Sequence, residues 1–378
     1  MNKTVKRFIS IICRVILGVV FLFSGFVKSV DPLGTAYKIT DYFEAFGMDF
    51  FSGMSLPLAI LLIIVEFTIG FNFLFGVQTR KTSWVAVLFM LVMTPLTLYL
   101  AIENPVSDCG CFGDAIVLTN WQTFYKNIAI DVLLLFVVLF SKYEFPWLSD
   151  WASLIVMAIP VIAVLSISVH AYRHLPQIDF RPYKIGNSIK DGMMLPEGAK
   201  TDKYNISFVY AKDGVEQEFS MADCPFGDST WVFVRQNSVL LEKGDVPPIH
   251  DFTMQNDDGE DITEDVLDRD GYTLLVVSSK VEKANNKHWK DLNALYQYAL
   301  SNRLAFYGMT ATYSESLEQY KQQYHIKFPF VATDEITLKT IIRSNPGLVL
   351  LKGDVVEGKW HYNDLPTVEE LKVIVKQK

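Results

Sequence analysis

Two of the four cysteines, Cys109 and Cys111, stand on either side of a single glycine in the stretch DCGCFGD. Cysteines at positions i and i+2 come within disulfide range if the chain bends slightly. The ring that they close is small and strained, and Gly110 supplies the backbone freedom that it requires. Strained, exposed disulfides tend to be labile or catalytic rather than structural. The spacing therefore predicts a pair that cycles between dithiol and disulfide.

Two other interpretations of this pair are open. A permanent disulfide would fasten the loop, either within the pair or to Cys224. A metal site would use both cysteines with Asp108 or Asp114, although CxC lacks the usual spacing of paired ligands. Cys224, in the stretch DCPFGD, is predicted to be a partner thiol or a lone thiol in a loop. Cys13 is predicted to be a buried apolar filler.

Charged residues within or next to apolar runs form a second group of candidates. Glu66 stands in the middle of such a run, where a carboxylate is costly and marks a functional or pairing site. Asp131 is similar, and Lys28 is a suitable partner for a carboxylate. Glu103 and Lys126 flank the cysteine stretch, where they would tune the thiol pKa. Glu66 is accordingly assigned either to proton movement or to helix–helix hydrogen bonding.

Long apolar runs must position these residues. A helix needs roughly 20 apolar residues to cross the hydrocarbon core, and five runs in the first part of the chain are candidates. The predicted spans are residues 8–27, 56–76, 84–101, 124–140 and 151–169. The fourth is shorter than the others and carries Asp131. The first is too long for the core of a signal peptide, so we expect it to remain as an anchor.

Lysine and arginine near the span ends predict the orientation. Six of them fall on one side of the bilayer, which is cytoplasmic if the N-terminus is inside: Lys3, Lys6, Arg7, Arg80, Lys81 and Lys142. Lys28 and Lys126 fall on the other side, against this trend. Five spans then place both the cysteine loop and the C-terminal part outside, in an oxidising compartment. The formal charge of −8 argues against a nucleic-acid partner. The expected partners are the lipid bilayer and an extracytoplasmic thiol protein.

Residues 1–145 resemble the MauE and DoxX membrane families. The matching features are SGFVKSVDP at the end of the first span, the glutamate of EFTIGFNFLFG, and CGCFGD before Trp121, Lys126 and Asn127. The CGCFGD element is typical of the MauE branch, which is thought to support disulfide formation in methylamine dehydrogenase. DoxX relatives are linked to quinone-coupled oxidation. The resemblance implies a four-helix domain in the bacterial inner membrane and thiol redox chemistry, with a quinone as the candidate cofactor.

Strands and helices alternate after residue 244, and a β-rich stretch precedes them. The predicted strands are residues 205–211, 218–221, 230–234, 272–278, 304–310, 328–333, 348–351 and 355–360, with a short hairpin over 252–262. The predicted helices are residues 286–301, 314–325, 335–343 and 367–376. Such alternation predicts a mostly parallel sheet covered on both faces.

This order resembles the thioredoxin-like fold in its TlpA or peroxiredoxin-type form. The stretch GDVPPIHDFTM matches the start of that domain, and Pro346 stands where the fold has a cis-proline. The catalytic CxxC would follow strand 272–278, but the chain has SSKVEKANN there. Because thiol–disulfide exchange needs a thiolate, this domain is predicted to dock a partner near Pro346. Lys339 and Arg343 would contact an acidic partner or lie on a solvated helix face.

The sequence thus predicts an all-α transmembrane bundle followed by an α/β domain. The bundle has a four-helix core over residues 1–145 and a fifth span over 146–175. A β-rich segment over 176–243 precedes a degenerate thioredoxin-like domain over 244–378. The predicted function is that of a membrane thiol–disulfide or quinone-linked redox protein, with Cys109, Cys111 and Glu66 as catalytic residues. The alternative is a non-enzymatic assembly or scaffold protein with a structural CxC disulfide.

Overall fold

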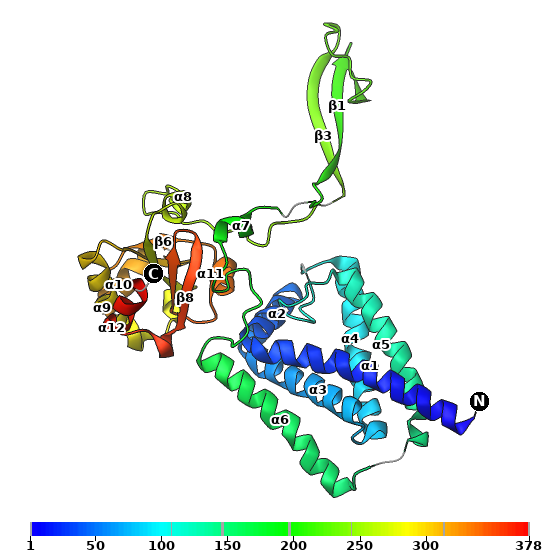
Figure 1. The fold of residues 1–378 in the computed structure, drawn as a ribbon. Coiled ribbons are helices and arrows are strands. Elements are labelled where there is room, and N and C mark those ends of the chain that lie inside the picture. The colour runs from blue at the N-terminus through cyan, green and yellow to red at the C-terminus, as the bar shows by residue number, and fades with distance from the viewer. Residues whose placement is uncertain are drawn as a thin grey trace.

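The computed structural model describes residues 2–106, 108–144, 147–195, 198–242, 244–312 and 314–376. Within these residues, five helices are long and apolar enough to cross a membrane, which confirms the predicted multi-pass part. They are α1 (Lys3–Val30), α3 (Ser55–Phe75), α4 (Thr79–Glu103), α5 (Asn120–Phe140) and α6 (Asp150–Arg173) (Figure 1). The span predicted over residues 124–140 is α5, which begins earlier than expected and is therefore long enough to cross.

Local signals set where these helices begin and end. The Thr119 hydroxyl accepts a hydrogen bond from the Gln122 backbone N–H, and the Gln122 side chain accepts one from the Thr119 N–H. This reciprocal capping box fixes the start of α5 directly after the cysteine loop. An additional helix, α2 (Pro32–Ala45), was not predicted. It begins with Asp31 as its N-cap and Pro32 at its first position, where a missing N–H costs nothing.

The first and third helices approach closely because glycines line their contact. A Cβ atom added to Gly18 would lie 2.6 Å from the backbone nitrogen of Leu74, so a larger residue would force a shift. Small residues allow membrane helices to pack in this way. Leu17 and Phe73 are fully buried at this contact, in a cluster that also contains Cys13. Cys13 is therefore the buried filler that the sequence predicts.

The C-terminal part contains a five-stranded sheet of order β6-β5-β4-β7-β8 among the described residues. Its strands are β4 (Tyr272–Ser278), β5 (Ala305–Thr310), β6 (Phe330–Ala332), β7 (Gly347–Lys352) and β8 (Val355–His361). β4 pairs in parallel with β5, and β5 with β6, whereas β7 is antiparallel to both β4 and β8. The predicted mostly parallel sheet is wrong. The sheet is mixed because β7 and β8 form a hairpin that joins it through β7.

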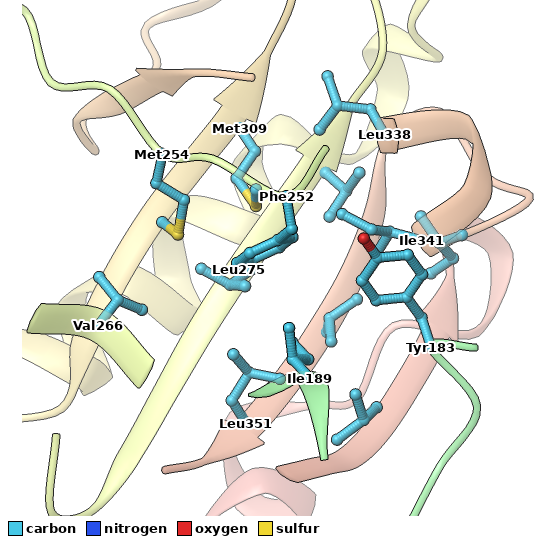
Figure 2. Packing of buried hydrophobic residues seen from close by; sticks show 14 of the residues in the cluster. Tyr183, Ile189, Phe252, Met254, Val266, Leu275, Met309, Leu338, Ile341 and Leu351 are labelled. Atoms are coloured by element: carbon cyan, nitrogen blue, oxygen red, sulfur yellow. The ribbon is translucent and has the colours of Figure 1, made fainter. Parts of the chain in front are cut away.

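Both faces of this sheet are covered, as predicted. Successive side chains along β4 point to opposite faces. Leu275 packs in one cluster with Phe252 and Ile341 (Figure 2), and Leu274 packs in the other with Trp289. The first cluster lies under α8 (Thr263–Leu267) and α11 (Glu335–Ile341). The second lies under α9 (Trp289–Ser301), α10 (Ser314–Tyr324) and α12 (Val368–Lys376).

The β-rich segment predicted for residues 176–243 is wrong as a single unit, because the structure divides it. Tyr183 and Ile189 pack in the core of the C-terminal domain (Figure 2), and Ser188 forms a bridge with Val355 of β8. The first part, which includes α7 (Ile189–Met193), therefore belongs to that domain. The rest forms a three-stranded antiparallel sheet that stands away from the remainder of the molecule (Figure 1). Its strands are β1 (Lys203–Lys212), β2 (Val215–Ser220) and β3 (Val232–Glu242).

Candidate functional site at the cysteine loop

The cysteine pair lies in the connection between α4 and α5. The Sγ atoms of Cys109 and Cys111 are 2.7 Å apart, and both thiols are free. The loop turns at Gly110, whose φ of 63° favours glycine, and the Cys111 N–H lies 3.3 Å from the Cys109 sulfur. The Thr123 hydroxyl, at the start of α5, also lies 3.3 Å from that sulfur. The structure thus brings the two predicted sulfurs into one hydrogen-bonded unit.

The two thiols differ strongly in acidity. The hydrogen bond from the Cys111 thiol lowers the pKa of Cys109 to about 6, and Thr123 and Lys126 add to the effect. The same hydrogen bond, together with burial, raises the pKa of Cys111. Lys126 and Cys111 line the same small cavity, and Lys126 Nζ lies 4.7 Å from the ring centroid of Phe112. At neutral pH, Cys109 is therefore mainly a thiolate, whereas Cys111 holds its proton.

Helix α2 holds the cysteine loop from another side. The Tyr42 hydroxyl donates to the backbone carbonyl of Cys109 at 2.6 Å. Lys38 Nζ lies 2.8 Å from a carboxylate oxygen of Asp108. Burial raises the pKa of Tyr42, so its hydroxyl stays protonated and able to donate. Neither α2 residue was predicted, because the helix itself was not.

A buried ion pair adjoins the loop inside the bundle. Lys28 Nζ lies 2.8 Å from Glu66 Oε2, and the two side chains are only 4% and 5% exposed. The Ser24 hydroxyl lies 2.8 Å from the same carboxylate oxygen and 2.7 Å from the carbonyl of Cys111, to which Lys28 also donates. Such a pair is stable only when further hydrogen bonds offset desolvation. Ser24, which was not predicted, and the Cys111 carbonyl provide them.

A small cavity of about 20 Å³ is lined by both Glu66 and Cys111. Its other walls come from α1, α4 and α5 and include Lys126 and Asn127. A space of this size has room for about one water molecule. It is too small for a quinone ring in this conformation, so the quinone remains a prediction.

The C-terminal domain docks on the same end of the bundle through Arg343. Its Nε lies 2.8 Å from Asp31 Oδ2, and its Nη2 lies 3.4 Å from Asp114 Oδ2. The Arg343 side chain is 7% exposed, and its guanidinium and the Lys339 ammonium both lie over the ring of Tyr37. The solvated helix face predicted for Arg343 is therefore wrong. The acidic groups that Arg343 contacts belong to the chain's own membrane domain.

The peptide bond between Asn345 and Pro346 is cis, as the resemblance to thioredoxin-like domains predicted. Asn345 Oδ1 accepts from the Ser278 hydroxyl at 2.7 Å, and its side-chain amide donates to the Lys280 carbonyl at 3.0 Å. These bonds join the cis-proline loop to the residues that follow β4, where the fold usually carries its cysteines. Because Arg343 lies just before this loop, this end of the sheet faces the membrane domain.

A cavity of about 200 Å³ lies between the cysteine loop and the docked domain, and Gly110 is part of its wall. Charged side chains of both signs line it: Asp31, Asp41, Asp108, Asp114 and Asp179, and Lys28, Lys38, Arg181, Lys339 and Arg343. A polar space therefore separates the cysteine loop from the C-terminal domain at this point. Asp108 faces Lys38 and Asp114 faces Arg343, so both carboxylates of the loop are paired with cations.

Three predicted residues lie away from the cysteine pair. Glu103 is exposed at the end of α4. Asp131 of α5 accepts a hydrogen bond from Thr94 of α4 at 2.8 Å. This is a helix–helix hydrogen bond of the kind that the sequence suggested for a carboxylate within a span. Cys224 is a free thiol in the connection between β2 and β3, hydrogen-bonded with Tyr210 on the outlying sheet. The structure does not bring Cys224 to the pair.

These features define a multi-pass membrane protein with a thiol pair at its contact with a thioredoxin-like domain. Residues 6–141 match the family model of methylamine utilisation protein MauE, over the region from α1 to α5 that contains the cysteine loop. The predicted resemblance to MauE is thereby confirmed, whereas the one to DoxX stays a prediction. Residues 204–243, on the outlying sheet, match a domain of unknown function (DUF8463). No curated protein matches the chain.

Two solved structures are similar to the C-terminal part. A candidate protein disulfide isomerase from Bacteroides thetaiotaomicron is 16% identical, with a TM-score of 0.27, over 34% of this chain and 82% of its own. StoA from Bacillus subtilis is 19% identical, with a TM-score of 0.26, over 32% of this chain and 94% of its own. At these values the likeness carries no functional argument. The strand order and the cis-proline loop themselves have the thioredoxin-like arrangement.

Proposed function

We propose that this chain is a membrane thiol–disulfide redox protein that uses Cys109 and Cys111. The observation that supports this most is the contact between two unequal thiols, 2.7 Å apart, one acidic and one protonated. Thiol–disulfide exchange needs such a division, because one sulfur must attack as a thiolate and the other must resolve the intermediate. The match to MauE and the thioredoxin-like domain agree with a disulfide-related role.

The reduced pair would react with a client disulfide in two steps. The Cys109 thiolate attacks one client sulfur, a mixed disulfide forms, and the second client sulfur leaves as a thiolate. Cys111 then loses its proton and attacks Cys109, so that the first client sulfur leaves as well. Two electrons have passed to the client, and the pair has become a disulfide. The same steps in reverse oxidise a client dithiol, and the two reduction potentials decide the direction.

Glu66 is proposed to accept the proton that Cys111 releases. Both residues line the water-sized cavity, so one water would connect the thiol with the carboxylate. Lys28 is a positioning residue in this scheme, because it binds both Glu66 and the Cys111 carbonyl. Lys126 would stabilise the Cys109 thiolate by its charge.

The proposal retains the predicted orientation, with the N-terminus in the cytoplasm of a bacterium and the cysteine loop outside the inner membrane. The C-terminal domain lies on the same side as the loop because Arg343 contacts Asp114. A thiol protein would displace Arg343 from Asp31, dock near Pro346 and reach the pair through the charged cavity. A quinone is the proposed second redox partner, taking up two electrons and two protons from the dithiol. Its binding would require α1, α4 and α5 to part.

Thiol trapping in intact membranes tests the proposal. The full chain with Cys13→Ser and Cys224→Ser serves as the parent, so that only Cys109 and Cys111 can react with the trapping reagent. We expect its disulfide fraction to follow the oxidation state of the quinone pool and of an added dithiol. Cys109→Ser should abolish the response. A pair that stays oxidised under every condition, in a chain where Cys109→Ser affects only stability, would reject the proposal.

A scaffold role is the second candidate, and the docked C-terminal domain favours it. This domain has no cysteine in the SSKVEKANN stretch after β4, and Arg343 fastens it to the bundle through a buried contact. In that role the CxC disulfide would be permanent and the domain would bind a partner without chemistry. The trapping experiment separates the two candidates, because only the redox role predicts a reversible pair.

A further inference from the structure

A second groove of the membrane domain lies between α3, α4 and α6, away from the cysteine pair. Its volume is about 380 Å³, within the range of small-ligand sites. Its walls are mainly apolar and include Ile64 of α3 with Leu154 and Val161 of α6. Because α6 lies outside the residues matched by the MauE model, this helix supplies a wall that the matched four-helix core lacks.

Two polar side chains of the groove carry unpaired atoms. Asn72 is 2% exposed, and its Oδ1 is buried with no hydrogen-bond partner among the described residues. The Thr68 hydroxyl, one helical turn further into the membrane, is likewise buried and has no hydrogen-bond partner among the described residues. Unpaired polar atoms at membrane depth are costly. A bound molecule that donates to Asn72 and accepts from Thr68 would remove this cost.

The mouth of the groove carries one cation and one anion. Lys81 Nζ and Asp150 Oδ1 are 3.6 Å apart, with side chains 74% and 89% exposed, and Gln78 donates to Asp150 at 2.8 Å. An exposed pair of this kind is weakly held. It can therefore open to a headgroup that itself carries both charges.

We propose that this groove binds one phospholipid with an ethanolamine headgroup. Its ammonium would donate to Asp150 and Asn72, and its phosphate would lie against Lys81. A lipid ester carbonyl would accept from Thr68, and one acyl chain would lie along Val161. A choline headgroup has no N–H to offer Asn72, and a glycerol headgroup has no cation for Asp150, so the site distinguishes the three lipids.

Lipid retention by the full-length chain tests this inference. The protein is reconstituted with equal amounts of phosphatidylethanolamine, phosphatidylcholine and phosphatidylglycerol, then extracted in mild detergent and analysed by native mass spectrometry. One phosphatidylethanolamine should remain bound. Asn72→Leu should weaken its binding about tenfold, the loss of one hydrogen bond to a charged group. Val161→Trp fills the groove from its outer wall and should abolish binding even if Asn72→Leu misfolds.

Leu135→Trp is the matched control, because it fills a different membrane groove, between α4 and α5. This variant should retain the lipid. Equal retention of the three lipids, a quinone in place of the phospholipid, or retention unaffected by Val161→Trp would overturn the inference. The result is independent of the cysteine pair, because bound lipid rather than thiol chemistry is measured.

Discussion

Replacing Cys111 by alanine should remove the unusual acidity of Cys109. The hydrogen bond from Cys111 is the largest cause of the pKa of about 6 at Cys109, compared with an ordinary value of 9.0. Without it, burial would raise the pKa of Cys109 back toward the ordinary value, although Thr123 and Lys126 would still lower it. At pH 7 the thiolate fraction would fall from about 90% toward the roughly 1% of an ordinary thiol. Because only the thiolate reacts, alkylation should slow, by at most about 90-fold, since the less acidic thiol gives the more nucleophilic thiolate.

The assay is the pH dependence of alkylation in the reduced full chain, with Cys13→Ser and Cys224→Ser in the background. Mass spectrometry of the cysteine peptide gives the rate at Cys109 for each pH. The midpoint should lie near 6 in the parent and should rise toward the ordinary value of 9.0 in Cys111→Ala. Cys111→Ser, which keeps a hydroxyl donor, should fall between them. A parent midpoint near 9.0, or one that Cys111→Ala leaves unmoved, refutes the assigned roles of the two thiols.

Arg343→Met should weaken docking of the C-terminal domain by up to about 3–5 kcal/mol, because it leaves the half-buried Asp31 carboxylate without its cation. Hydrogen exchange in α2 and α11 measures this, and unchanged protection would contradict it. Docking should also weaken in acid. Burial, the largest single influence, opposes ionisation of Asp31, but the charges of Arg343 and Arg181 and the hydrogen bonds from Gly34 and Arg343 together outweigh it and lower the Asp31 pKa. The stabilisation of docking by ionised Asp31 is complete above its ordinary pKa of 3.8 and is lost as the pH falls through its lowered pKa in the docked state. Cross-linking between the cysteine loop and the C-terminal domain should therefore decline in that acidic range. Lys28→Met should cost about 3–5 kcal/mol of unfolding free energy by stranding Glu66, and Lys28→Met with Glu66→Leu should recover most of it. Thermal unfolding in detergent checks this, and an additive double variant would show that the pair does not couple.

The membrane spans could be predicted because their signal is local. Apolar length alone identifies a spanning helix, and a charge such as Glu66 within one must find a partner or a function. Lys28 could be proposed as that partner from its position at the end of the first span. The register that brings Lys28 to both Glu66 and the Cys111 carbonyl depends on how α1 packs against α3, which no local pattern reveals.

Long-range contacts account for most of what the sequence did not predict. Arg343 and Asp31 are 312 positions apart, so only the assembled fold can pair them. Tyr183 packs on the C-terminal sheet although residues 198–242 separate it from the rest of that domain. The α2 helix had a local signal, an Asp–Pro start, and Lys38 and Tyr42 stand four residues apart on one face of it. That short helix could have been predicted.

Helix α2 connects the docked domain to the cysteine pair. Asp31 caps its first turn and binds Arg343, while Lys38 and Tyr42 further along it bind the cysteine loop. A client that displaces Arg343 would therefore free the N-cap of the helix that holds the Cys109 carbonyl. Docking and thiol geometry share one rigid element, which gives a domain without cysteines a physical means of affecting the chemistry of the pair. If so, Arg343→Met should shift the alkylation midpoint of Cys109, although Arg343 touches neither sulfur.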